Sequence, residues 1–167
     1  LSWTFNSGSE AFNYLAKGES LILTYTITVA DKDDSGNLTG TSDTQNVVIT
    51  INGSNDAPVI SVLSGDSASA SINETNTTRT ATDTLTVRDI DRSDVVIAEV
   101  TSVTASGTTA GLGSNNASLL SMLTVTDTNI AANSGNTNNL SWTFNSGSEA
   151  FNYLAKGESL VLTYTIT

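Results

Sequence analysis

Residues 21–29 read LILTYTITV, and this stretch decides the fold class. Every second residue is a large apolar one, and three of the four residues between them are threonine. A period of two is typical of a β-strand with one apolar face. Residues 47–51, VVITI, show the same period. Shorter strands are expected over residues 1–5, 59–63, 68–72, 84–88, 95–103 and 120–126. Because runs of Ser, Gly, Asn and Asp separate these segments, we predict an all-β fold, an antiparallel β-sandwich.

The strand at residues 21–29 lies within a longer segment that occurs twice. Residues 1–28 read LSWTFNSGSEAFNYLAKGESLILTYTIT, and residues 140–167 differ from them only by Val161 in place of Ile22. The offset is 140 − 1 = 139 residues. That period is too long for a solenoid unit, so it indicates a tandem array in which each repeat is a whole domain.

The domain junction is expected at residues 53–58, GSNDAP, directly after the strand at 47–51. Pro58 holds the chain extended and suits the first residue of a new strand. We therefore expect residues 1–56 to be the C-terminal part of one repeat. Residues 57–167 would form the N-terminal and central part of the next, so that this sequence is cut out of phase with the repeat.

Composition excludes several classes of function. The 167 residues contain no cysteine and no histidine, which removes disulfides, thiolate chemistry and nearly all zinc and Ser-His-Asp sites. The formal net charge of −11 disfavours nucleic acid as a partner. No apolar run approaches the roughly 18 residues of a membrane span, so no membrane insertion is expected. Only residues 11–17 suggest a single helical turn.

The first acidic cluster follows the strand at residues 21–29. Asp31, Asp33, Ser35 and a following glycine match the opening of an oxygen-ligand calcium loop, D-x-D-x-S-G. An EF-hand would need Glu at its twelfth position, where this chain has Ser followed by Asp43. Two interpretations stay open: a calcium loop on a β-hairpin, or a plain acidic hairpin turn.

The second acidic cluster, Asp89, Asp91 and Asp94, follows the strand at residues 84–88. Carboxylates at this spacing repel one another unless a cation or a nearby Arg92 relieves the repulsion. We therefore predict calcium as the cofactor at this position.

The third cluster lies at the junction itself. Asn55 and Asp56 offer oxygen ligands there, and Glu74 of the next repeat is a further candidate ligand. All three clusters fall at predicted strand ends.

Three stretches carry a resemblance to a known family. Residues 24–60, TYTITVADKDDSGNLTGTSDTQNVVITINGSNDAPVI, resemble the C-terminal half of a VCBS-type repeat joined to the next one. Residues 14–20, YLAKGES, resemble the turn before its penultimate strand, and residues 72–94, INETNTTRTATDTLTVRDIDRSD, are similar to its opening strands with their D-x-D. These repeats are bacterial cadherin-like domains found in tandem in giant adhesins of the repeats-in-toxin class.

The resemblance implies an immunoglobulin-like or cadherin-like β-sandwich in a tandem array. It also implies an extracellular location on the bacterial cell surface after type I secretion. Neighbouring repeats of the same chain would be the main partners. In such a fold the loops at 89–94 and 31–43 lie at the pole where the chain enters a repeat, so the acidic clusters would converge on one junction and hold calcium.

Two functions follow from these features. The first is a structural extender repeat of a secreted or cell-surface adhesin, stiffened by calcium at its junctions. The alternative is a carbohydrate- or surface-binding β-sandwich module that uses Trp3 and Trp142, although their alternation with Leu and Phe favours burial in a core. An enzyme is not expected, because the acidic residues lie at strand ends beside Gly and Ser rather than along a cleft.

A complete second repeat would need its own copies of the Asp31 loop and of the strand at residues 47–51. The six residues 53–58 span at most about 20 Å, which makes it difficult for the chain to supply that strand to itself. Two explanations stay open: head-to-tail strand complementation between molecules, or domain boundaries that differ from those given above.

Overall fold

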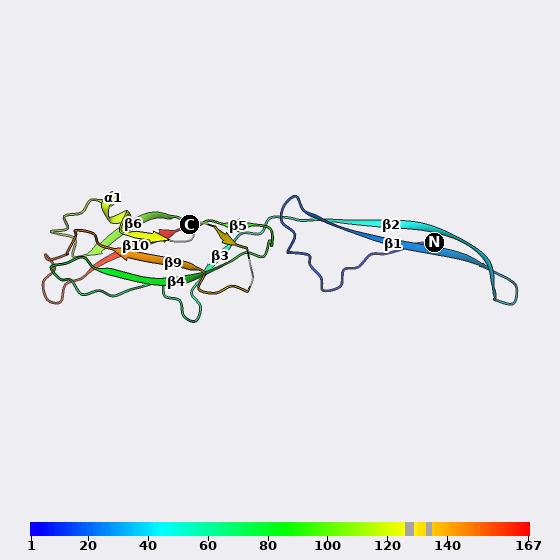
Figure 1. Ribbon diagram of the computed structural model, residues 1–167, viewed down its shortest axis with the longest axis horizontal. Helices are drawn as coiled ribbons and strands as arrows, with labels where there is room; N and C mark the ends of the chain where they lie inside the picture. Colours follow the sequence, from blue (N-terminus) through cyan, green and yellow to red (C-terminus); the bar gives the residue numbers. More distant parts are fainter. Residues whose placement is uncertain (126–128, 133–134) are drawn as a thin grey trace. The chain divides into compact units, whose positions relative to one another are not determined.

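The computed structural model describes residues 1–125, 129–132 and 135–167 (Figure 1). The described chain is built mostly of strands, paired antiparallel, with one short helix. The all-β antiparallel class is therefore confirmed. In chain order the elements are β1 (Ser20–Lys32), β2 (Leu38–Asn52), β3 (Val59–Ser61), β4 (Thr80–Arg88), β5 (Val95–Val96), β6 (Val100–Gly107), α1 (Asn116–Leu120), β7 (Leu123–Val125), β8 (Ile130–Ala131), β9 (Leu140–Asn145) and β10 (Leu160–Ile166).

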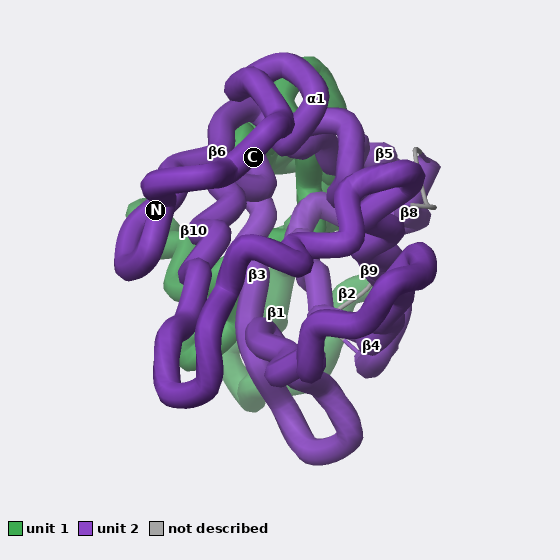
Figure 2. The backbone as a smooth tube through the Cα atoms, turned by 90° about the vertical axis from the view of Figure 1, so that its left-hand side faces the viewer, with its two compact units in different colours: residues 1–56 green, residues 57–167 purple. Residues whose placement is uncertain are grey.

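The chain divides into two compact units, Leu1–Asp56 and Ala57–Thr167, which we call unit 1 and unit 2 (Figure 2). The assignment of these units to successive repeats stays a prediction. Each unit is described by itself below.

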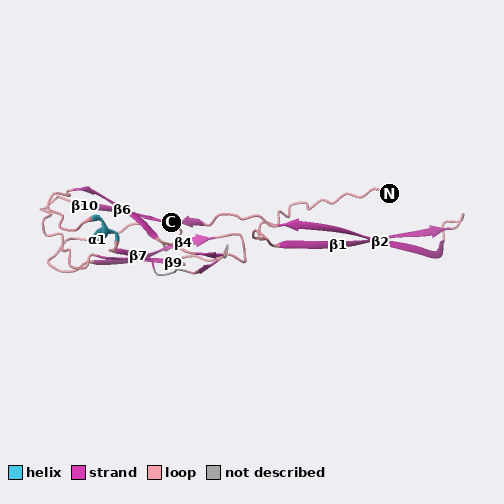
Figure 3. Ribbon diagram, turned by 90° about the horizontal axis from the view of Figure 1, so that it is seen from above, coloured by secondary structure: helices cyan, strands magenta, loops and turns pink. Residues whose placement is uncertain are grey.

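Unit 1 is organised around one long antiparallel hairpin of β1 and β2 (Figure 3). Leu21 lies opposite Ile51, and Tyr25 lies opposite Val47. Most apolar residues of the alternating pattern are half-buried, whereas the threonines between them are exposed. Because a two-stranded hairpin is only marginally stable alone in water, this apolar face needs a cover.

Residues 1–19 of unit 1 supply part of that cover without forming a strand. The ring of Phe5 packs against that of Tyr25, with centroids 6.4 Å apart. Leu15 and Ala16 are buried, and a side chain at Gly53 would collide with their carbonyl oxygens. The helical turn expected over residues 11–17 is wrong, because this segment folds as successive hydrogen-bonded turns.

Unit 2 contains a four-stranded sheet in the order β3-β4-β9-β7. It also contains the pair β10-β6 and the short pair β5-β8. In the four-stranded sheet, Val59 of β3 lies opposite Arg88 of β4, and Leu85 of β4 lies opposite Leu140 of β9. In the pair β10-β6, Tyr164 of β10 lies opposite Val103 of β6.

The core of unit 2 consists of two clusters of buried apolar side chains. Phe144 of β9 and Tyr164 of β10 pack against both clusters, and their rings meet edge to face at 6.5 Å. The first cluster comprises Leu85, Val87, Val96, Ala98, Leu123, Ile130, Leu140 and Trp142. The second comprises Val103, Leu119, Met122 and Phe151.

The helix α1 was not anticipated from the sequence. Its N-terminus is capped by the side chain of Asn115, which accepts a hydrogen bond from the Ser118 N–H at 2.9 Å. Leu119 faces the core, and its carbonyl accepts a hydrogen bond from the Tyr164 hydroxyl at 2.9 Å. Burial raises the pKa of Tyr164 to about 12. Across the described residues, no helix has the length and apolar character needed to cross a membrane.

Five expected strands differ from those observed. The strand expected over 95–103 is divided into β5 and β6, which pair with different strands, and the one expected over 59–63 is shortened to β3. Residues 68–72 form no strand, and the strand expected over 120–126 is reduced to β7, with Thr126 outside the described residues. Residues 1–5 also form no strand, although the identical residues 140–144 belong to β9. In unit 2 the copy is hydrogen-bonded between β4 and β7, and unit 1 contains no equivalent of those strands.

Candidate functional site

The strongest candidate site is the turn from Asp89 to Asp94, directly after β4. Asp89 is 5% exposed and Asp91 is fully buried. One carboxylate oxygen of Asp89 accepts a hydrogen bond from the Asp91 N–H at 3.0 Å, and the Asp91 carbonyl accepts one from the Asp94 N–H at 3.1 Å. The Ala132 N–H donates to the Asp94 carbonyl at 3.0 Å, which ties the turn to the segment after β8.

Two adjacent carboxylates inside the protein are an unusual arrangement. Burying an ionised carboxylate is costly unless charge and hydrogen bonds compensate it. Val59 lies opposite Arg88, so the chain enters unit 2 beside the residue that directly precedes this turn. Asp89, Asp91 and Asp94 therefore belong to one turn at the end of unit 2 where the chain enters.

The loop between β1 and β2 uses its acidic side chains to make the turn. One carboxylate oxygen of Asp33 accepts hydrogen bonds from the Ser35 N–H at 2.9 Å and the Asn37 N–H at 2.8 Å. The Asn37 bond is the main reason why the pKa of Asp33 is lowered. Asp33 and Ser35 are exposed. These contacts are those of an acidic hairpin turn.

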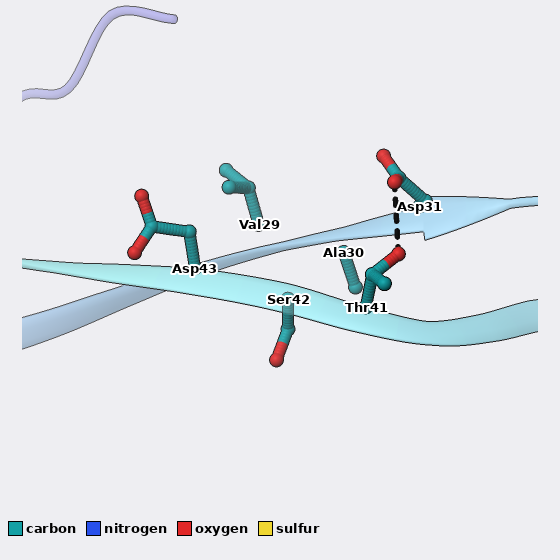
Figure 4. Close-up of a pocket in the computed structure, with 6 residues that line it drawn as sticks. All are labelled: Val29, Ala30, Asp31, Thr41, Ser42 and Asp43. Atoms are coloured by element: carbon teal, nitrogen blue, oxygen red, sulfur yellow. Dashed lines mark hydrogen bonds between the residues drawn. The ribbon is translucent and has the colours of Figure 1, made fainter.

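Asp31 and Asp43 lie on the two strands beside that turn, on the same face of the hairpin (Figure 4). Asp31 accepts a hydrogen bond from the Thr41 hydroxyl at 2.9 Å, and Asp43 accepts one from the Thr44 N–H at 2.8 Å. Both carboxylates are exposed. They border a shallow hollow of about 280 Å³ that also involves Val29.

Asn55 and Asp56 lie at the other end of the same hairpin. They follow Asn52, which pairs with Ser20, whereas the acidic loop follows Lys32. Twelve residue steps along β1 correspond to about 40 Å. Within unit 1 the first and third acidic clusters are therefore far apart, and the structure does not bring them together.

Glu74 is also remote from the turn at Asp89–Asp94. When the Asn152 amide is oriented with its nitrogen toward Glu74, that nitrogen donates a hydrogen bond to the Glu74 carboxylate at 3.3 Å. The neighbouring Thr78 hydroxyl donates to the Gly147 carbonyl at 2.6 Å, beyond the end of β9 that pairs with Thr80. The nine residues of β4 span about 26 Å, so Glu74 lies at the opposite end of unit 2.

Within the described residues, no three or more carboxylate, His or Cys side chains are grouped so as to hold a metal ion. Within each unit, the candidate ligands thus do not form one site. Asp89, Asp91 and Asp94 are close in the sequence. The burial of Asp89 and Asp91 could not be predicted from their spacing.

The two tryptophans do not form an exposed aromatic platform. Trp142 is 6% exposed, and its indole N–H donates to the Ser67 carbonyl at 2.8 Å. Burial in a core is therefore confirmed for Trp142. It is wrong for Trp3, which is 57% exposed in unit 1.

A second polar cluster, centred on Asp66, was not singled out from the sequence. Asp66 accepts hydrogen bonds from the hydroxyls of Thr84 at 2.8 Å and Thr86 at 2.7 Å, and from the Asn138 amide at 2.6 Å. The Leu63 N–H donates a fourth at 3.0 Å. This cluster fastens two loops onto β4, so we assign it a structural role.

The Asp66 cluster predicts a specific acid sensitivity. Partial desolvation raises the pKa of Asp66, but the four hydrogen bonds lower it more, to about 2, from an ordinary value of 3.8. A lowered pKa means that the stabilisation is complete above about pH 4 and is lost as the pH falls through about 2.

We expect the free energy of unfolding to decrease between pH 4 and pH 2, and Asp66→Asn to flatten that decrease. Urea unfolding followed by circular dichroism at several pH values measures it. Asp83→Asn, on β4 outside the cluster, serves as the control and should keep the wild-type slope. A profile unchanged by Asp66→Asn would contradict the assignment.

Comparison with known proteins leaves the family open. No family model matches the sequence, and no curated protein matches it.

Proposed function

We propose that this chain is a structural extender repeat of a secreted or cell-surface bacterial adhesin, stiffened by calcium at its junctions. The observation that carries the proposal is the repeat itself. The segment 1–28 recurs as residues 140–167, an offset of 139 residues (140 − 1). Both copies contain the same contact between a Phe ring and a Tyr ring. Phe5 meets Tyr25 at 6.4 Å, and Phe144 meets Tyr164 at 6.5 Å. A repeated sequence that keeps its internal packing favours tandem copies of one domain.

The strand order supports an immunoglobulin-like sandwich for that domain. The order β3-β4-β9-β7 corresponds to A-B-E-D of a constant-type immunoglobulin fold, and β6-β10 corresponds to C-F of the facing sheet. Strand G would then pair with β10. In unit 1, β2 has that position relative to β1, the copy of β10.

Calcium fits the turn at Asp89–Asp94 better than the other candidate positions. Ca²⁺ takes six to eight oxygen ligands, including carboxylates, backbone carbonyls and water. Asp89 and Asp91 would supply desolvated carboxylates and Asp94 a third. Since three carboxylates are fewer than a full ligand set, carbonyls, water and an adjoining repeat would complete it.

An extracellular location follows from the same proposal. Calcium sites of extracellular modules operate in the 10⁻⁴–10⁻³ M range, a concentration found outside cells. The low lysine and arginine content, six residues in all, also suits a solvated acidic surface rather than a nucleic-acid partner. Export by type I secretion remains part of the proposal through the family resemblance.

A thermal melt with chelator, calcium or magnesium tests the calcium site. Calcium at roughly ten to a hundred times its Kd would stabilise the folded state by about 1.4–2.7 kcal/mol. We expect the Tm of unit 2 to rise by about 5–15 °C with calcium and much less with magnesium. Asp91→Asn and Asp89→Asn should abolish the rise.

The control is Asp83→Asn, which makes the same charge change on β4 outside the turn. It should preserve the calcium response. An equal response in all variants, or none in the wild-type chain, would rule out this turn as the calcium site.

A further inference from the structure

Two segments that are far apart in the sequence meet at the end of unit 2 opposite the turn at Asp89–Asp94. One is residues 74–76, ahead of β4, and the other is the turn that carries Asn152. One terminal atom of the Asn152 amide lies 3.1 Å from the Thr75 carbonyl oxygen and 3.2 Å from Asn76 Oδ1. The same atom lies 3.3 Å from Glu74 Oε2. Three oxygens therefore converge on one side-chain amide.

Neither orientation of the Asn152 amide satisfies all of these oxygens. With its nitrogen toward them, the amide offers two hydrogens to three acceptors. Its own oxygen then lies 3.1 Å from the same Asn76 Oδ1. Because this Asn76 atom is close to both terminal atoms of the Asn152 amide, turning either amide around still leaves one contact between two atoms of the same kind. Hydrogen bonds alone thus leave the cluster incompletely paired.

The spacing of the cluster matches the ligand shell of calcium. With the Asn152 oxygen turned inward, the cluster contains one carboxylate, two side-chain amide oxygens and a backbone carbonyl, all of which are calcium ligands in proteins. Two oxygens bound to one Ca²⁺ at about 2.4 Å and roughly 80–90° apart are about 3.1–3.4 Å from each other. The Asn152 atom is 3.1 to 3.3 Å from its three neighbours. An octahedral Mg²⁺ would need oxygens about 2.9 Å apart, so the spacing favours calcium.

We propose that Glu74, the Thr75 carbonyl, Asn76 and Asn152 bind a calcium ion, at a site separate from the turn at Asp89–Asp94. The side chains of Glu74, Asn76 and Asn152 are exposed, so water can complete the six to eight ligands that Ca²⁺ takes. Because the site has one carboxylate, its Kd should lie in the range of about 10⁻⁴–10⁻³ M, as in extracellular modules. This site does not depend on calcium binding at the turn.

The fold holds Asn152 from both sides. Phe151, directly before it, is 9% exposed in the second core cluster, and its N–H donates to a Glu149 carboxylate oxygen at 3.1 Å. Tyr153, directly after it, donates its hydroxyl hydrogen to the Thr108 carbonyl at 2.9 Å. A ligand between two anchored aromatic residues is pre-organised, which lowers the entropic cost of binding an ion.

The opposite segment is fastened to the loop after β9. The Thr78 hydroxyl donates to the Gly147 carbonyl at 2.6 Å. The Arg79 N–H donates to the Ser146 hydroxyl oxygen at 2.9 Å, and the Arg79 carbonyl accepts a hydrogen bond from the Ser146 N–H at 2.9 Å. These contacts fix the chain directly after residues 74–76, so both halves of the proposed site rest on ordered structure.

Nearby carboxylates favour a cation at this position. Burial raises the pKa of Tyr153, and the negative charges of Glu149 and Glu158 raise it further. Since Tyr153 is next to Asn152, both carboxylates add negative potential near the proposed ligands.

Unit 1 contains a copy of the Asn152 turn that serves as a control. Asn13 is the copy of Asn152, and the Phe12 N–H donates to a Glu10 carboxylate oxygen at 2.9 Å, as Phe151 does to Glu149. Residues 74–76, ETN, occur once in the sequence. The effect of the turn can therefore be separated from that of the segment opposite it.

Calcium titration of the whole chain, followed by ¹⁵N-edited NMR, tests the site. The side-chain amide signals of Asn76 and Asn152 report directly on two proposed ligands. We expect both signals to shift saturably with calcium chloride, with a Kd of about 10⁻⁴–10⁻³ M, and at least roughly tenfold more weakly with magnesium chloride. Asp91→Asn, which removes a ligand of the turn, should leave these shifts unchanged.

Glu74→Gln removes the charge at the site but keeps an oxygen that can accept a hydrogen bond from the amide. We expect the Kd reported by the Asn152 signal to rise at least roughly tenfold, because ligand charge sets calcium affinity. Glu99→Gln makes the same charge change at an exposed position of unit 2 and should keep the wild-type Kd. Asn152→Ala should abolish the shift of the Asn76 signal, whereas Asn13→Ala should preserve it.

Two results would overturn the proposal. Absence of saturable shifts, or an equal Kd in the wild-type chain and Glu74→Gln, would mean that the Asn152 amide forms hydrogen bonds only. Shifts that are lost with Asp91→Asn and kept with Glu74→Gln would assign the ion to the turn instead, leaving the proposed function intact. Conversely, shifts at Asn152 without any response of the turn to calcium would support this site and refute the turn.

Discussion

Replacing Trp142 with alanine is expected to lower the free energy of unfolding of unit 2 by about 3–5 kcal/mol. Trp142 is 6% exposed within the first core cluster. Its indole N–H also donates a hydrogen bond to the Ser67 carbonyl. The substitution therefore leaves a large cavity and one carbonyl without its donor. Guanidinium unfolding monitored by far-ultraviolet circular dichroism measures the loss.

Trp3→Ala is a closely matched control, because residues 1–21 and 140–160 have the same sequence. Trp3 is 57% exposed, so its replacement should change stability by less than about 1 kcal/mol. Equal effects of the two substitutions would mean that both copies have equivalent environments, contrary to the structure.

Asn139→Ala is expected to cost about 2–4 kcal/mol. The Asn139 side chain accepts a hydrogen bond from the Val87 N–H at 2.7 Å and donates one to the Val87 carbonyl at 2.8 Å. Val87 is 2% exposed, so alanine would leave two backbone groups in the interior without these partners. In effect, the amide extends the ladder of β4 beyond Leu85, which pairs with Leu140.

The matched control is Asn73→Ala, at an exposed position of the same unit. It should alter stability by no more than about 0.5 kcal/mol. The same denaturant titration serves both variants. A small effect of Asn139→Ala would show that water readily replaces the amide at Val87.

The fold class was predictable because alternation is local information. The strand at residues 21–29 carries its two-residue period wherever it is placed, and it is a strand in both copies. Residues 1–5 show the limit of that reasoning. The same five residues are a strand at 140–144 and irregular at 1–5, because their strand pairing depends on β4 and β7.

The helix α1 lay within reach of the sequence. Asn115 is a favourable N-cap, and Leu119 and Met122 are spaced three residues apart as on one helical face. Its five residues were too few to show a sustained period of 3.6. Short helices are therefore more visible through their caps than through their periodicity.

The candidate sites also differ in whether their residues are close together in the sequence. The turn at Asp89–Asp94 was found because its carboxylates are neighbours in the sequence. Asp66 was not found, because Thr84, Thr86 and Asn138 lie 18, 20 and 72 residues further along the chain. The burial of Asp91 likewise depends on the fold around it.

The shortness of β3 has a mechanical consequence. β3 pairs with β4 over three residues, Val59–Ser61, whereas β4 and β9 are joined by six residue pairs from Thr80 to Leu85. A pull on the chain ahead of Ala57 runs along β3 and loads those three pairs in shear. Under tension, β3 should therefore detach from β4 first, at a force well below that needed to separate β4 from β9. Unit 2 would then lengthen before its core opens.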